Sequence, residues 1–133
     1  NMKNSKQISG LKEVLNGKEH LVLINQCFDN AIRLLQLDKR ITYCEGLVEC
    51  RGLTLRHAWN SFNGEEFDLT AEYFMTPKMQ AERVYYKEYE SSDIRIIAKF
   101  RNAHIEKIEK LRKKLLKGDL LTNEENEFLV QNM

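Results

Sequence analysis

The sequence predicts an α+β fold, in which helices at both ends of the chain flank a small antiparallel sheet of three to four strands. Apolar residues recur at helical spacing near both ends, and the middle alternates between apolar and polar residues. Within that middle part, Asn63-Gly64 separates two alternating runs, which is the strongest short-range signal for a β-hairpin. With 133 residues, 42% of them hydrophobic, we expect a single domain over residues 1–133.

Two helices are expected before the sheet. Residues 8–15 place apolar side chains at helical spacing, interrupted by one glycine, and Asn16-Gly17 supplies a stop signal. A second helix is expected to begin close to Cys27, where apolar residues return at helical spacing, with Asn25 as its N-cap. This second helix would pack on the sheet.

The sheet is expected to come from four segments rich in apolar, β-branched and aromatic residues. Arg51-Gly52 separates the first two segments, Asn63-Gly64 forms the turn between the second and third, and Pro77 lies in a loop before the fourth. The expected strands are residues 41–50, 55–62, 65–70 and 83–89.

Two further helices are expected after the sheet. Apolar residues spaced three and four apart run from Ile94 to Leu115, and Gly118 ends the run. Thr122 and Glu125 then match a capping box, which is typical of a helix N-terminus. The C-terminal part of the chain is therefore expected to be helical.

The composition argues against several classes of protein. With 21 basic and 20 acidic residues, the net charge of +1 lacks the basic excess of a dedicated nucleic-acid-binding domain. No apolar run approaches the ~20 residues that a membrane-spanning helix needs. The three cysteines show no C-x-x-C spacing, and the sequence has no P-loop, G-x-G-x-x-G or H-E-x-x-H motif. We therefore expect a reducing, cytoplasmic setting, with no membrane, metal or cofactor.

The expected hairpin would bring two polar side chains together. A two-residue turn pairs Phe62 with Glu65, and side chains on one face of a strand repeat every second residue. In this register His57, Trp59 and Asp68 share a face. His57 and Asp68 would then be diagonal neighbours within reach of a hydrogen bond.

Cys27 is the candidate nucleophile for this histidine–carboxylate pair. An imidazole that donates one ring N–H to a carboxylate keeps its other nitrogen free to act as a base. At the first turn of a helix, the helix dipole and the unpaired N–H groups favour a thiolate and stabilise an oxyanion. Cys27, His57 and Asp68 would thus form an acyl-transfer site. Cys44 and Cys50, roughly 20 Å apart on one face of a strand, are expected to be core residues.

Four short motifs follow one another in the sequence: NQCFDNA at residues 25–31, YCEG at 43–46, HAWN at 57–60 and DLT at 68–70. Together they resemble the papain-like and transglutaminase-like cysteine enzymes, and most closely their small bacterial and phage-type members. The resemblance covers about residues 25–74. It implies a nucleophilic cysteine that opens a helix packed on an antiparallel sheet, followed by histidine and then by aspartate or asparagine.

The resemblance also implies roles for the matched residues. Cys27 would be the nucleophile, His57 the general base and acid, and Asp68 the carboxylate that orients the histidine. Further substrate-binding or site-shaping candidates are Trp59, Gln26, Asn25 and Glu45, of which Trp59 would shield the histidine–carboxylate contact from water. Papain-like proteases place an oxyanion-hole glutamine several residues before the cysteine, whereas Gln26 is adjacent to Cys27. We therefore expect Gln26 to point elsewhere.

The leading hypothesis is cysteine-dependent acyl transfer on a protein or peptide amide, by hydrolysis, glutamine deamidation or transamidation. The alternative is a non-enzymatic phage or bacterial protein that keeps the same fold and binds or inhibits a partner. A third hypothesis is nucleic-acid binding through the basic residues of 107–117, but Glu106 and Glu109 nearby favour a solvated helix face. The sequence indicates no particular oligomeric state.

Overall fold

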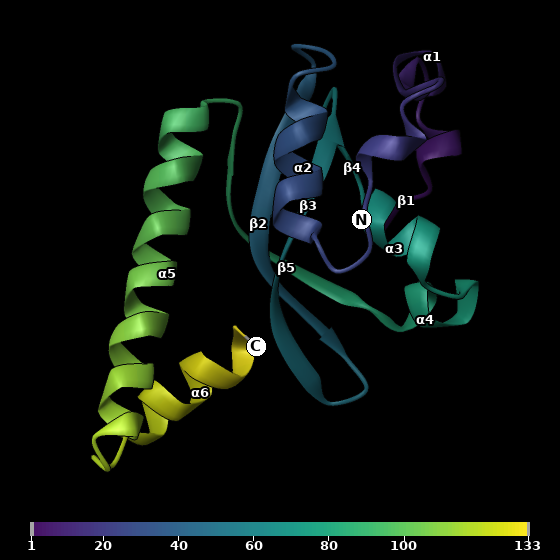
Figure 1. Ribbon diagram of the computed structural model, residues 1–133. Coiled ribbons are helices and arrows are strands. Elements are labelled where there is room, and N and C mark those ends of the chain that lie inside the picture. Colours follow the sequence, from purple (N-terminus) through teal and green to yellow (C-terminus); the bar gives the residue numbers. More distant parts are fainter. Residues whose placement is uncertain (1, 133) are drawn as a thin grey trace.

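A five-stranded mixed sheet forms the centre of the computed structural model, which describes residues 2–132 (Figure 1). The strands lie in the order β1-β4-β3-β2-β5, with β1 parallel to β4 and the other pairs antiparallel. Their bounds are β1 (Met2–Lys3), β2 (Ile41–Cys50), β3 (Leu53–Phe62), β4 (Glu65–Phe67) and β5 (Val84–Ser91). The α+β prediction is confirmed. The expected number of three to four strands is wrong because β1 has only two residues, too few to carry a periodic pattern.

Helices surround the sheet. They are α1 (Leu11–Leu15), α2 (Cys27–Leu35), α3 (Leu69–Phe74), α4 (Pro77–Glu82), α5 (Ile94–Leu116) and α6 (Asn123–Gln131), with short 3-10 turns at Ser5–Gln7 and Glu19–Leu21. Figure 1 shows α2 lying along β2 and β3, while α5 stands beside the sheet and α6 turns back from its far end. Among residues 2–132, none of the helices has both the length and the apolar character needed to cross a bilayer.

Three local expectations are wrong, each for a backbone reason. Gly10, with φ of 85°, precedes α1, so that helix begins at Leu11 rather than at residue 8. Asn25 has a positive φ of 58° and is not the N-cap of α2; that position belongs to Gln26, whose side chain makes no capping bond. Pro77 does not lie in a loop but opens α4, where its missing N–H costs no helical hydrogen bond.

The β3–β4 hairpin has the expected register over its strand residues. Phe62 pairs with Glu65, and Asn63 and Gly64 both have positive φ, as a two-residue hairpin turn requires. The strand after the turn ends at Phe67, however, and not at residue 70 as expected. The side chain of the next residue accepts a backbone N–H and caps α3, so a helix replaces the last part of the expected strand.

The core holds α2 against the sheet. Ala31 and Leu34 of this helix are buried in two apolar clusters, one with strand residues and Ile97 of α5, the other with α1 and the β3–β4 hairpin. Buried Asn60 on β3 donates to the carbonyl of Ala31 at 2.9 Å and to that of Thr42 on β2 at 3.1 Å. These contacts fix the position of α2 over β2 and β3, and with it the position of Cys27.

Candidate active site

His57 on β3 and Asp68 form a buried hydrogen-bonded pair. The Nε2 atom of His57 donates to Oδ2 of Asp68 at 2.7 Å, and the two side chains are 9% and 3% exposed. The predicted contact is confirmed, although Asp68 reaches His57 from the N-cap of α3 and not from a strand. Its other oxygen, Oδ1, accepts the backbone N–H of Ala71 at 3.2 Å. The carboxylate therefore both caps a helix and orients the imidazole.

Two further side chains approach the same carboxylate oxygen. The hydroxyl of Tyr85 on β5 donates to Oδ2 of Asp68 at 2.6 Å, and the guanidinium of Arg83 lies 3.8 Å from it. Burial raises the pKa of Asp68, but His57, Arg83 and Tyr85 together more than offset this effect and hold that pKa below its usual value. Both residues fall in the strand expected at residues 83–89, but the sequence does not indicate their contact with Asp68, because the register of β5 against the distant β2 has no local signal.

The surroundings of His57 favour its positively charged form. Burial lowers its pKa, but the neighbouring Asp68 carboxylate and the Cys27 side chain act in the opposite direction and raise the pKa from 6.5 to about 9. Because Nε2 is engaged with Asp68, Nδ1 is the ring nitrogen left to exchange a proton with another group.

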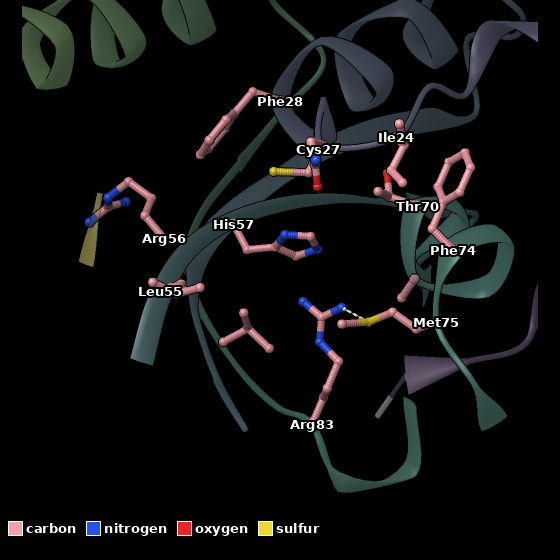
Figure 2. A pocket seen from close by; sticks show the side chains of 13 residues that line it. Ile24, Cys27, Phe28, Leu55, Arg56, His57, Thr70, Phe74, Met75 and Arg83 are labelled. Carbon is pink, nitrogen blue, oxygen red and sulfur yellow. Dashed lines mark hydrogen bonds between the residues drawn. The ribbon is translucent and has the colours of Figure 1, made fainter. Parts of the chain in front are cut away.

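Cys27 is the first residue of α2 and is partly buried. It lies beside the His57 ring at the wall of a shared cavity (Figure 2). The first hydrogen bond of the helix joins the N–H of Asn30 to the carbonyl of Gln26. The backbone N–H groups at the start of the helix, before Asn30, therefore have no carbonyl partner within the helix. The structure thus brings the predicted nucleophile, base and carboxylate to one place.

The cavity has a volume of about 460 Å³ and a mostly apolar wall. Its lining residues include Cys27, His57 and Thr70, the apolar side chains of Ile24, Phe28, Val48, Leu55, Phe74 and Met75, and the polar side chains of Asn25, Arg56 and Arg83. No aspartate or glutamate is among the described residues that line it. Cavities of this size are typical of small-molecule or side-chain binding sites.

Trp59 lies where a water-excluding side chain would be needed. It is 1% exposed, and its ring stacks on His57 with centroids 6.1 Å apart and an interplanar angle of 18°. Tyr85 meets the Trp59 ring edge-on at 5.0 Å. Trp59 and Tyr85 thus enclose the inner side of the His57 ring.

Gln26 and Asn25 differ in orientation. The side-chain oxygen of Gln26 accepts a hydrogen bond from Arg33 at 2.7 Å, as expected for a residue that does not complete the site. Asn25 lines the cavity next to Cys27. Of the two residues, only Asn25 is therefore among the described residues of the cavity wall.

Glu45 does not line the cavity, because its side chain is fully buried on β2. Its carboxylate accepts hydrogen bonds from Tyr43 at 2.6 Å, Tyr89 at 3.0 Å, Arg56 at 3.1 Å and Arg101 at 3.3 Å. Arg56 is itself a lining residue. The position of Glu45 fits a site-shaping residue and does not fit contact with a substrate.

Asn30 belongs to the NQCFDNA motif, and its side chain holds the segment before Cys27 in place. It is 1% exposed, and its amide both donates to and accepts from the backbone of Leu23, at 2.7 and 2.8 Å. The same amide donates to Oγ1 of Thr70 at 3.0 Å. Asn30 thus joins the segment before Cys27 to the helix capped by Asp68.

The other two cysteines lie apart from this site. Cys44 is fully buried on β2, where burial raises the pKa of its thiol well above the usual range, and Cys50 is partly buried at the end of the strand. Within the part of the chain that the structure describes, no group of three or more histidine, cysteine or acidic side chains is placed to hold a metal ion.

Comparisons of the chain with protein-family models, with curated proteins and with solved structures found no match.

Proposed function

We propose that the protein is a cysteine-dependent acyl-transfer enzyme acting on a protein or peptide amide. The observation that supports this proposal is the His57–Asp68 hydrogen bond beside Cys27, at the wall of a cavity of about 460 Å³. Nucleophile, base and orienting carboxylate in this arrangement match the general geometry of covalent acyl transfer. The cavity offers room for the group that carries the carbonyl.

The charge on His57 defines the first half of the reaction. A positively charged ring beside a thiol stabilises the thiolate, which attacks the carbonyl carbon of the substrate. Backbone N–H groups at the start of α2 would stabilise the oxyanion that forms. His57 then transfers its Nδ1 proton to the leaving amine, and the acyl group remains on Cys27 as a thioester.

The second half returns the enzyme to its starting state. Neutral His57 accepts a proton from the incoming nucleophile as that nucleophile attacks the thioester carbon, and Cys27 leaves as the thiolate. Water as the nucleophile gives hydrolysis of a peptide or deamidation of a glutamine side chain, and an amine gives transamidation. Throughout both halves, Asp68 holds the ring and balances its charge.

The pH profile of Cys27 alkylation tests the proposal. Iodoacetamide labelling at pH 5.5–9.5, with Cys27 followed by peptide mass spectrometry, should show rapid modification well below pH 8 in the wild type. His57→Gln should slow this labelling at least about tenfold at pH 6.5, because the cation beside the thiol is lost. His20→Gln is a matched control, because His20 is exposed in a 3-10 turn outside the cavity lining.

Cys27 labelling no faster than that of a free thiol with a pKa of about 8.5 would contradict the enzyme proposal. It would favour the rival proposal, a binding protein that keeps the same fold without activity. Buried Cys44 gives an internal reference for each sample, because it should remain unmodified as long as the protein is folded.

A further inference from the structure

Arg83 is a buried cation in the cavity wall with few partners. Its side chain is 6% exposed, and it precedes β5 at the floor of the cavity (Figure 2). A guanidinium group has five N–H donors. Among residues 2–132, the structure gives this group one hydrogen bond, from Nη1 to the sulfur of Met75 at 2.7 Å. A thioether sulfur is a weak acceptor, and none of the Arg83 nitrogens is among the buried atoms of the described residues that lack a partner, so the other donors remain accessible from the cavity.

The nearest carboxylate, that of Asp68, forms a long ion pair with Arg83 and is shared with His57. Oδ2 of Asp68 lies 3.8 Å from Nη1, beyond hydrogen-bond distance, and already accepts bonds from His57 and Tyr85. The guanidinium also packs over the Tyr85 ring, 5.2 Å from its centroid. In Figure 2 its nitrogen atoms point toward His57 and the open part of the cavity.

Arg56, the other arginine in the cavity lining, differs in this respect. Arg56 is paired with Glu45 at 3.1 Å and with Glu88 at 2.7 Å, so its charge is balanced within the protein. The carboxylate that is paired with Arg83 is also paired with His57, so a single carboxylate serves two basic side chains. This surplus of positive charge favours an anion in the space that Arg83 faces. No acidic residue among those described in the lining supplies that anion.

We propose that Arg83 is a specificity-determining residue that binds a carboxylate carried by the acyl part of the substrate. This inference rests on the proposed function and names its substrate class: amides whose acyl portion combines an aliphatic or aromatic body with a negative charge. Phe74 and Met75 supply the apolar wall next to Arg83, and the guanidinium supplies two parallel N–H donors for a carboxylate. An acidic side chain in the acyl part has this chemistry, and so has the main-chain carboxylate of a C-terminal glutamine whose side-chain amide is the reacting group.

Two alkylating reagents of similar size and different charge test the role of Arg83 without requiring turnover. Iodoacetate is an anion and iodoacetamide is neutral, and both transfer a substituted methyl group to the Cys27 sulfur with loss of iodide. The ratio of their rates at Cys27 reports the charge that the cavity presents to the reagent. Arg83→Gln should lower the iodoacetate-to-iodoacetamide ratio about tenfold, because it removes a charge-assisted contact.

Two variants complete the comparison. Arg83→Lys keeps the positive charge and should retain most of the wild-type iodoacetate-to-iodoacetamide ratio. If the Arg83 side chain were needed only for packing, the lysine and glutamine variants would instead show the same ratio. Arg95→Gln makes the same change in net charge at a side chain that is 89% exposed, and should leave the ratio unchanged. An unchanged ratio in Arg83→Gln would overturn the inference. Slow iodoacetamide labelling of the wild type would instead count against the proposed function.

A second measurement uses the wild-type protein alone, so it does not depend on the folding of any variant. N-acetylglutamate amide and N-acetylleucine should protect Cys27 from iodoacetamide better than their neutral partners, N-acetylglutamine amide and N-acetylleucine amide. Protection by the first anion identifies an acidic side chain as the preferred group, and protection by the second identifies a C-terminus. If neither anion protects better than its neutral partner, Arg83 does not select for a carboxylate.

Discussion

His57 should make the stability of this protein depend on pH in a specific direction. Its pKa is 6.5 in an unfolded chain and about 9 in the fold, so the folded state binds a proton that the unfolded state releases. The stabilisation is therefore fully present below pH 6.5 and is lost as the pH rises through 9. A rise of this size corresponds to about 3 kcal/mol of folding free energy.

Urea unfolding can measure this effect, with the fluorescence of Trp59, the single tryptophan, as the signal. Wild type and His57→Gln would be compared between pH 5.5 and 9.5, with far-UV circular dichroism as a second probe. The free energy of unfolding should fall by about 3 kcal/mol more in the wild type than in the variant. With an m-value of about 1.5 kcal/mol/M, the extra fall moves the wild-type midpoint by about 2 M urea.

Asp68→Asn provides the complementary perturbation, because it removes the carboxylate that raises the His57 pKa. Above pH 6.5, the free energy of unfolding of Asp68→Asn should depend on pH as little as that of His57→Gln. The free energy of unfolding of His20→Gln should follow the pH dependence of the wild type. Although burial opposes it, the same ion pair lowers the pKa of Asp68 below 3.8. The stabilisation that the ionised carboxylate contributes is therefore present above pH 3.8 and is lost as the pH falls further. Equal slopes in wild type and His57→Gln would refute the charged imidazole, and with it the proton donor of the proposed mechanism.

Three further variants test the surroundings of the site. Gly46→Ala should lower the free energy of unfolding in urea by about 3 kcal/mol, because the added methyl group would collide with the carbonyl oxygen of Tyr86 on β5. A smaller loss would mean that the two strands separate easily. Glu45→Ala should cost about 3–5 kcal/mol in the same assay by leaving two arginines without their buried carboxylate, and an unchanged midpoint would contradict the ion pairs. Asn30→Ala should cost about 2 kcal/mol and slow Cys27 alkylation, since the preceding segment loses its anchor; unchanged labelling would show that the segment holds its place without it.

Local signals predicted those parts of the site whose residues are close in sequence. The strand β2 has the expected bounds, and the hairpin register follows from Asn63-Gly64, whose positive φ values fit few other dipeptides. The start of α2 at Cys27 was also expected. Each of these features depends on the backbone preferences of two or three neighbouring residues.

Contacts between distant segments were not predictable in this way. Tyr85 and Arg83 reach Asp68 because β5 pairs with β2, and the register of that pairing shifts at a bulge between Glu45 and Gly46. Gly46 within the strand is typical of an irregularity or a close backbone approach, and the bulge lies there, but the glycine does not indicate which residues of β5 pair across it. The expected strand at residues 65–70 was wrong because the Asp68 side chain accepts the N–H of Ala71 and caps α3, so the chain is helical from Leu69.

The motifs that are scattered along the sequence meet as one set of interacting groups. Asn30 of the first motif binds Thr70 of the last, and Asn60 of the third binds the helix that begins at Cys27. Asp68 is fixed from two sides, because Oδ1 caps α3 while Oδ2 holds the imidazole. The carboxylate cannot turn away from His57 without also uncapping a helix, so its orientation is secured by the fold before any substrate binds. In the proposed mechanism, a site that is ordered in this way would need no binding energy to assemble its base, and that energy would remain for positioning the carbonyl against Cys27.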